Sequence, residues 1–180
     1  MISDEEFYGK IDKIDSECRW SDYFFELCDV IAKKSKDPST KVGCVIVNSS
    51  HSIASTGYNG FPVGVIDNLI DFSDENSVLK KSPRYVKPQK YLWTAHAEEN
   101  AIAIAARNGV SLNGTTLYVN RMIPCARCTR LIIQSGIKKV YVMQDAPQEI
   151  IDRWKEEHDV SITMMEEAGV DLFVIEGSGK

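Results

Sequence analysis

The sequence TAHAEENAIAIAARNGVSLNGTTLYVNRMIPCARCTR, residues 94–130, determines how the rest of the chain is interpreted. Residues 95–108 form an alanine-rich helical pattern, residues 114–120 predict a strand, and residues 125–134 predict a second helix. Pro124 suits the entry to that second helix, because its fixed φ and missing N–H are tolerated there. The stretch therefore predicts a helix–strand–helix unit in which metal-binding residue types stand at both helix starts.

His96, Cys125 and Cys128 are those metal-binding residues. Zinc prefers imidazole nitrogen and thiolate sulfur and usually takes four ligands, so three protein ligands leave the open position of a catalytic site. Water at such a position has its pKa lowered toward roughly 7. The positive end of a helix dipole also favours thiolates. The spacing therefore predicts a catalytic rather than a structural zinc site.

Glu98 follows His96 by two residues in the same predicted helix. Two residues turn an α-helix by roughly 200°, so Glu98 does not share a face with His96 and is a poor fourth ligand. A carboxylate within reach of the reacting water can instead act as a general acid and base. His-x-Glu or Cys-x-x-Cys alone would mean little, but together they match the H-x-E and P-C-x-x-C pattern of zinc nucleobase deaminases.

Composition indicates one globular domain over residues 1–180, with 43% hydrophobic and 26% charged residues. The net charge of −5 and the pI of about 5.3 disfavour a polynucleotide partner. No apolar run of membrane-spanning length and no secretory leader are found, so we expect no membrane partner and a cytoplasmic protein, or one of the host cytoplasm if the chain is viral. The cysteines outside the motif, Cys18, Cys28 and Cys44, are expected to be free thiols.

The remaining elements complete an α/β pattern with a five-stranded mixed sheet, an initial hairpin followed by strands that alternate with helices. Further helices are predicted at 20–36 and 147–168, and further strands at 42–48, 52–56, 137–143 and 170–175. Residues 57–64 read as a glycine-rich loop that can approach a ligand closely. Residues 1–19 are interpreted as an N-terminal extension, and residues 65–94, which lack clear periodicity, as an insertion before the metal motif.

Over roughly residues 20–176 the chain resembles the deoxycytidylate (dCMP) deaminases of the zinc-dependent cytidine/deoxycytidylate deaminase superfamily. The segments that carry this resemblance are SKDPSTKVGCVIVN (35–48), GYNGFPVG (57–64), HAEENAI (96–102), PCARC (124–128) and LIIQSGIKKVYV (131–142). The resemblance implies a three-layer cytidine-deaminase-like fold with helices on both faces of the sheet. It also implies hydrolytic deamination of dCMP to dUMP and ammonia, with dUMP supplied for dTMP synthesis.

The resemblance further implies roles for individual residues. Glu98 would shuttle protons at the zinc site, Asn48 would contact the deoxyribose, Ala97 would contact the substrate, and Lys36 or Lys41 would bind the 5′-phosphate. The GYNG segment, which consists of Gly57, Tyr58, Asn59 and Gly60, resembles the family's allosteric site, where dCTP with Mg²⁺ activates and dTTP inhibits. Members regulated in this way are typically homohexamers.

The chain departs from the family pattern at two places. Between Val119 and Pro124 it has four residues where the family more often has three, which makes Arg121 a candidate phosphate partner. Residues 90–95 contain no histidine, whereas some viral members bind a second zinc there, so we expect one zinc per chain.

Two alternatives stay open at this point. One is another deaminase of the superfamily, acting on cytidine, a free base or a tRNA adenosine. The other is a non-catalytic module in which zinc only stabilises the fold. Glu98 and the open zinc position disfavour that second alternative.

Overall fold

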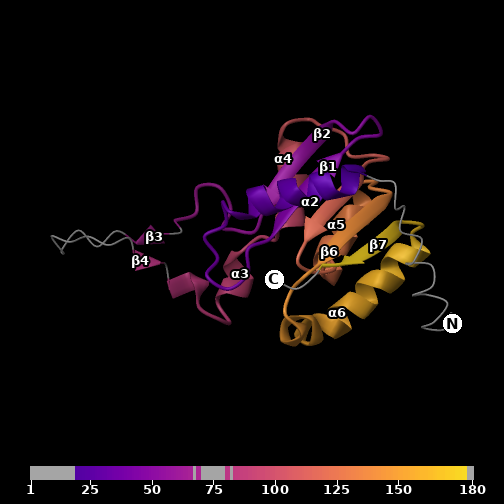
Figure 1. The fold of residues 1–180 in the computed structure, drawn as a ribbon. Helices are drawn as coiled ribbons and strands as arrows, with labels where there is room; N and C mark the ends of the chain where they lie inside the picture. The colour runs from indigo at the N-terminus through magenta and orange to yellow at the C-terminus, as the bar shows by residue number, and fades with distance from the viewer. Residues whose placement is uncertain (1–18, 67, 70–79, 82, 178–180) are drawn as a thin grey trace.

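The computed structural model describes residues 19–66, 68–69, 80–81 and 83–177 (Figure 1). Its main sheet contains five strands in the order β2-β1-β5-β6-β7. The strands are β1 (Gly43–Val47), β2 (Ile53–Tyr58), β5 (Thr116–Asn120), β6 (Lys139–Gln144) and β7 (Asp171–Glu176). The main helices are α2 (Arg19–Ala32), α4 (Ala97–Arg107), α5 (Ala126–Gln134) and α6 (Gln148–Glu167).

The sheet is mixed because β1 runs antiparallel to both of its neighbours, β2 and β5, whereas β5, β6 and β7 run parallel. Val119 of β5 stands opposite Cys44 of β1 on one side and Val142 of β6 on the other. The parallel strands connect through α5 and α6, as parallel pairs require.

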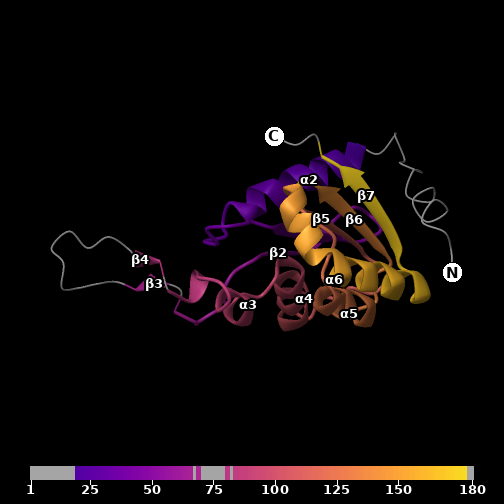
Figure 2. The same ribbon diagram turned by 90° about the horizontal axis from the view of Figure 1, so that it is seen from below.

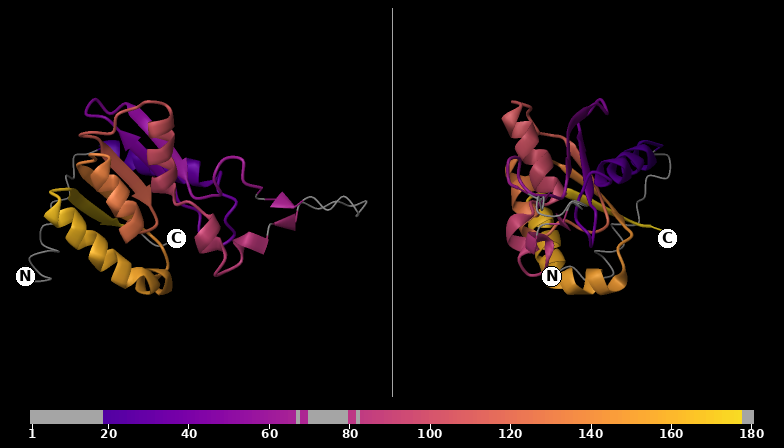
Figure 3. Two further views of the ribbon diagram at one scale, coloured as in Figure 1. Left: turned by 180° about the vertical axis from the view of Figure 1, so that it is seen from behind. Right: turned by 90° about the vertical axis from the view of Figure 1, so that its left-hand side faces the viewer.

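Helices cover both faces of this sheet. Helix α2 lies on one face, and α4, α5 and α6 lie on the other (Figures 2 and 3). Under α2, Phe24 and Phe25 pack against Tyr118 of β5. The opposite core contains alanines of α4 and the aliphatic residues Leu117, Ile132 and Val140. The alanine-rich helix therefore lies close to the sheet, because its buried face carries only small side chains.

The predicted α/β class, the five-stranded mixed sheet and the three layers are confirmed. Two boundaries differ from the predictions. Helix α2 ends at Ala32 rather than residue 36, and strand β2 continues through Gly57 and Tyr58, which were expected in a loop. At the first of these, Lys33, Lys34 and Ser35 donate to carbonyls three residues earlier, so the chain leaves the α-helix in a tighter turn before residue 36.

The segment between β2 and α4 contains short elements. They are β3 (Asn68–Leu69), β4 (Lys80–Lys81), the 3₁₀ turn η1 (Pro83–Tyr85) and α3 (Lys90–Trp93). Phe61 stacks on Tyr85 at 4.5 Å between ring centroids, and the Arg84 guanidinium lies 4.0 Å from the centre of the Trp93 ring. The predicted N-terminal extension lies outside the described residues except for Arg19. Within the described part of the chain, no helix has the length and apolar character that crossing a membrane requires.

Candidate metal and active site

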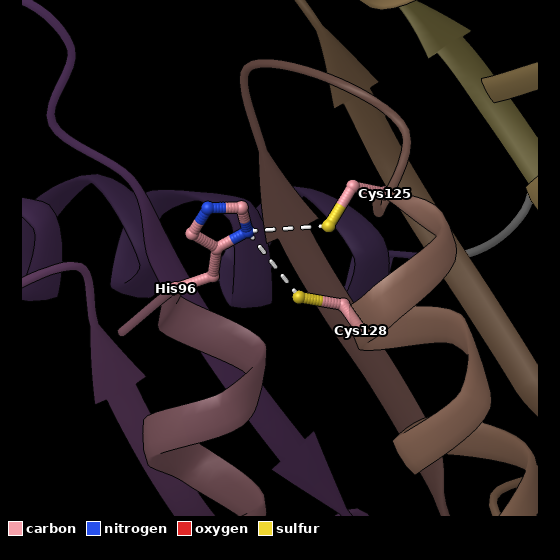
Figure 4. A group of neighbouring side chains, drawn as sticks. All are labelled: His96, Cys125 and Cys128. Atoms are coloured by element: carbon pink, nitrogen blue, oxygen red, sulfur yellow. Dashed lines mark hydrogen bonds between the residues drawn. The ribbon is translucent and has the colours of Figure 1, made fainter. Parts of the chain in front are cut away.

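His96, Cys125 and Cys128 converge at the starts of two neighbouring helices (Figure 4). The His96 Nδ1 atom lies 3.3 Å from the Cys125 sulfur and 3.4 Å from the Cys128 sulfur. All three ligand atoms lie within 4.8 Å of one another. Zinc holds sulfur at about 2.3 Å and nitrogen at about 2.0 Å, and tetrahedral angles then separate neighbouring ligand atoms by roughly 3.5 Å. One imidazole and two thiol groups at these separations therefore fit a zinc ion.

Helix capping positions the ligands. His96 and Cys125 are the residues that immediately precede the first turns of α4 and α5. The Glu99 carboxylate accepts the His96 backbone N–H at 2.7 Å and forms an ion pair with Arg127 at 3.0 Å. One side chain thus fixes the start of α4 and joins it to the first turn of α5, which keeps the histidine and the cysteines at their spacing.

The two cysteines differ in their proton affinity. A hydrogen bond from Cys128, together with the nearby His96, lowers the pKa of Cys125 to about 3. The pKa of Cys128 is raised by the same shared hydrogen bond and by burial. Burial lowers the pKa of His96, but the Cys125 thiolate and the Glu98 carboxyl outweigh it, so the net shift is upward. These opposite shifts favour a thiolate at Cys125 and a thiol at Cys128.

Glu98 is 5% exposed and borders the same cavity as His96 and Cys125. Burial is the main cause that raises the pKa of its carboxyl group, and the opposing effect of His96 does not cancel it. A carboxyl group with a raised pKa can take up a proton near neutral pH and give it back, which suits proton transfer.

The cavity above these groups has a volume of about 310 Å³, which lies at the lower end of the range for small-molecule sites. Its aromatic walls come from Tyr91 of α3 and Trp154 of α6, whose ring centroids lie 6.0 Å apart. Trp154 also lies 6.2 Å from the His96 ring. The cavity is therefore bounded by the motif helices, by α6 and by the segment that precedes α4.

A polar network forms another wall. The Lys90 ammonium lies 2.8 Å from the Asp37 carboxylate, and both side chains are buried. The Asn59 side chain donates to Asp37 and to the Thr40 carbonyl and accepts the Val42 N–H at 2.8 Å. This network joins the loop before β1, the end of β2 and helix α3.

Of the predicted substrate residues Ala97 and Asn48, only Ala97 lies at the cavity. Ala97 lines the cavity and is fully buried. Asn48 follows the opposite end of β1 from Val42, so six residues at about 3.3 Å each put it roughly 20 Å from the cavity. Its side chain accepts hydrogen bonds from the backbone of Ser50 and Ser52. The predicted deoxyribose contact of Asn48 is therefore corrected: Asn48 stabilises a turn.

The predicted phosphate residues also require correction. Lys36 and Lys41 are exposed and are not among the described residues that line the cavity. Arg121 adopts a positive φ of 83° and forms ion pairs with Asp29 and Asp145. Its guanidinium group is thereby held by two carboxylates away from the lining residues, so the structure does not support its expected role as a phosphate partner.

The GYNG segment is divided among different environments. Gly57 packs against α4, Asn59 borders the cavity, and Gly60 exchanges backbone hydrogen bonds with Ala95. Tyr58 is the one exposed side chain of the four. The segment therefore contributes to the cavity wall as well as to the surface.

Several residues that line the cavity were missed by sequence reasoning. They are Lys87, Lys90, Thr94, Arg153, Trp154 and His158. Thr94 and His158 each bury a polar atom, Oγ1 and Nε2, for which the described part of the chain offers no hydrogen-bond partner. The lysines and Thr94 lie in or next to an aperiodic segment, and the other three residues lie on α6, far along the chain, so no local motif distinguishes them.

The fold and the site together define a zinc-dependent deaminase. The family model of the cytidine and deoxycytidylate deaminase zinc-binding region matches residues 18–144, and the chain belongs to this family.

Relatives of known name agree with this assignment. The chain is 39% identical over 154 residues to an uncharacterized deaminase in the luxG 3′ region of Aliivibrio fischeri, covering 86% of this chain and 92% of that protein. It is 38% identical over 133 residues to the deoxycytidylate deaminase of Mus musculus, covering 74% and 69%. The crystal structure of the dCMP deaminase from cyanophage S-TIM5 in complex with dCMP and dUMP matches with a TM-score of 0.60 and 24% identity, covering 86% and 95%.

Proposed function

We propose that this protein catalyses the hydrolytic deamination of dCMP to dUMP and ammonia. The observation that carries the proposal is the buried Glu98 carboxyl group, which borders one cavity together with His96 and Cys125. The names of the relatives support dCMP as the substrate, because the mouse protein is a deoxycytidylate deaminase.

His96, Cys125 and Cys128 would hold the zinc ion, which activates water for attack near neutral pH. In the proposed reaction, the oxygen of water bonds to C4 of the cytosine and the C4–N4 bond breaks to release ammonia. Glu98 accepts a proton from the attacking water, protonates N3, and moves a proton to the departing amino group. The sum is dCMP plus water giving dUMP plus ammonia, with no redox change.

We further propose that the product supplies dTMP synthesis, and that the enzyme is a homohexamer activated by dCTP with Mg²⁺ and inhibited by dTTP. The GYNG sequence supports the regulatory part of this proposal. Since Gly57 and Asn59 are buried against other parts of the chain, Tyr58 is the side chain of this segment that is best placed to meet an effector.

Ammonia release should be measured with dCMP, deoxycytidine and cytidine, each with and without dCTP-Mg²⁺ and dTTP. Turnover of dCMP far above that of both nucleosides, raised by dCTP and lowered by dTTP, is expected. A preference for dCMP without any effector response would retain the reaction and reject the regulation. Equal turnover of all three substrates would reject dCMP as the specific substrate.

A further inference from the structure

Two cationic side chains that line the cavity have no partner among the described residues. Lys87 lies in the loop between η1 and α3, and Arg153 lies on α6. Both are exposed, and neither forms an ion pair or hydrogen bond within the part of the chain that the structure describes. Lys90, the other cation of the lining, is neutralised by Asp37 at 2.8 Å. Lys87 and Arg153 are therefore the positive groups that remain available to a ligand.

The cavity has a buried end, its floor, beside the metal ligands, and a solvent-exposed end, its rim, that carries the positive charges. Glu98 and Cys125 at the floor are 5% and 7% exposed, whereas Lys87 and Arg153 are open to solvent. A nucleoside monophosphate is polarised in the same sense, because its base lies at one end and its dianionic phosphate at the other. With the reacting carbon of the base at the floor, the phosphate points to the rim.

An aromatic contact brings the two cation-bearing segments together. Tyr91 and Trp154 approach to 6.0 Å between ring centroids across α3 and α6. Lys87 precedes Tyr91 by four residues, and Arg153 is adjacent to Trp154. Both cations line the cavity that this aromatic contact borders, although 66 residues separate them in sequence.

We propose, on the basis of the proposed function, that Lys87 and Arg153 bind the 5′-phosphate of the substrate and thereby make the enzyme prefer a nucleotide to a nucleoside. Arg153 offers a planar pair of N–H donors that matches phosphate, and Lys87 adds a point charge. Glu149 also lines the cavity, one helical turn before Arg153. Its carboxylate weakens phosphate binding, because it repels the phosphate and attracts the Arg153 guanidinium group.

The test uses the variants Lys87→Gln, Arg153→Gln and the double variant, each loaded with zinc. We expect KM for dCMP to rise roughly 10- to 100-fold in each single variant, as for the loss of a charge-assisted hydrogen bond, while kcat changes little. Deoxycytidine turnover should not change, because that substrate has no phosphate. Glu149→Gln should lower KM for dCMP instead of raising it.

Lys155→Gln provides the matched control, since Lys155 lies on the same helix, outside the cavity, and pairs with Asp159. Zinc content and thermal unfolding verify that each variant is folded. Inhibition constants of dUMP and deoxyuridine then compare the binding of a ligand with and without the phosphate, independently of turnover. Unchanged KM for dCMP and unchanged dUMP inhibition in the double variant would overturn the assignment of these residues. A wild-type enzyme that turns over deoxycytidine as well as dCMP would instead overturn the proposed function before any variant is made.

Discussion

Glu98 is the residue that we propose to transfer protons, and its surroundings suit that role. It is buried beside the ligand set, and its pKa is raised mainly by burial. His96 is the extended residue that precedes α4, whereas Glu98 lies in the first turn of that helix. A carboxyl group in this position is suited to move protons without occupying a coordination position.

Replacing Glu98 with Gln is expected to preserve the fold and the bound zinc and to lower kcat by roughly 10²- to 10⁴-fold, the usual contribution of a general acid or base. The amide has nearly the same shape but cannot accept and return a proton. Metal analysis and dCMP turnover check this, with the exposed Glu166→Gln of α6 as the control. Wild-type turnover in the Glu98 variant would contradict the assigned role.

The cluster of His96, Cys125 and Cys128 could be predicted from sequence, because each of these residues lies within a short motif at a helix start. The residues that we propose to bind phosphate could not. Lys87 and Arg153 come from different segments and meet only when α3 and α6 pack together. Asn48, Lys36 and Lys41 were assigned through resemblance, and a turn and an exposed loop occupy those positions in this chain.

At the scale of elements, Asp37 determines how the loop after α2 meets the rest of the site. Its carboxylate accepts hydrogen bonds from the N–H groups of Ser39 and Thr40, from Asn59 and from the buried Lys90 ammonium. One side chain thereby holds the loop before β1, the end of β2 and α3 together around the cavity.

Asp37→Ala is expected to lower the free energy of unfolding by about 3–5 kcal/mol, because it leaves the Lys90 ammonium buried without a counter-ion. The double variant Asp37→Ala/Lys90→Met should lose less than the sum of the two single variants, since it removes both charges. Urea unfolding of the single and double variants measures this coupling. Strict additivity of the two losses would show that the pair does not interact.

Gly57 determines how closely α4 approaches β2. A Cβ atom at Gly57 would lie 2.2 Å from the Ala97 carbonyl oxygen and 2.5 Å from the Ala101 nitrogen, both backbone atoms. Gly57→Ala should therefore push the first turn of α4 outward and lower stability by about 1–3 kcal/mol. The same displacement would move His96, so zinc affinity should fall as well.

Gly60→Ala is the matched control for Gly57→Ala, because its added Cβ would meet only the Tyr58 ring at 3.5 Å, an ordinary contact. Urea unfolding and zinc titration of both variants make the comparison. If Gly57→Ala were as stable as Gly60→Ala, α4 would not be held by this contact.

At the scale of the whole molecule, hydrophobic pattern predicted the order of the elements well, because the strands are short β-branched runs and both motif helices end in turn residues. The hydrophobic pattern predicted no helix or strand within residues 65–94. There, contacts such as Phe61 on Tyr85 and Arg84 on Trp93 replace periodic burial. Structure held by individual aromatic contacts leaves no repeating signal in the sequence.

Zinc binding connects this architecture to pH, because the ligands must lose their protons to bind. In the metal-free site Cys125 has a pKa of about 3 and is already ionised at neutral pH, whereas Cys128 holds its proton. The pKa of His96 is raised, so a fraction of His96 also carries a proton near pH 7, and that fraction grows as the pH falls. Binding should therefore release the Cys128 proton, and the share of a proton that His96 adds should grow as the pH falls.

Isothermal titration of the zinc-free protein in buffers of different ionisation enthalpy gives the number of protons directly. Zinc affinity should fall as the pH is lowered from 8 to 6, and the melting temperature in excess zinc should fall with it, because the metal stabilises only the folded state. The His96→Ala variant should lose the component of proton release that grows at low pH. Proton release that is independent of pH and unaffected in this variant would show that His96 is already neutral before zinc binds.

The binding isotherm should also end at one zinc per chain, and a second equivalent of bound zinc would require ligands outside His96, Cys125 and Cys128.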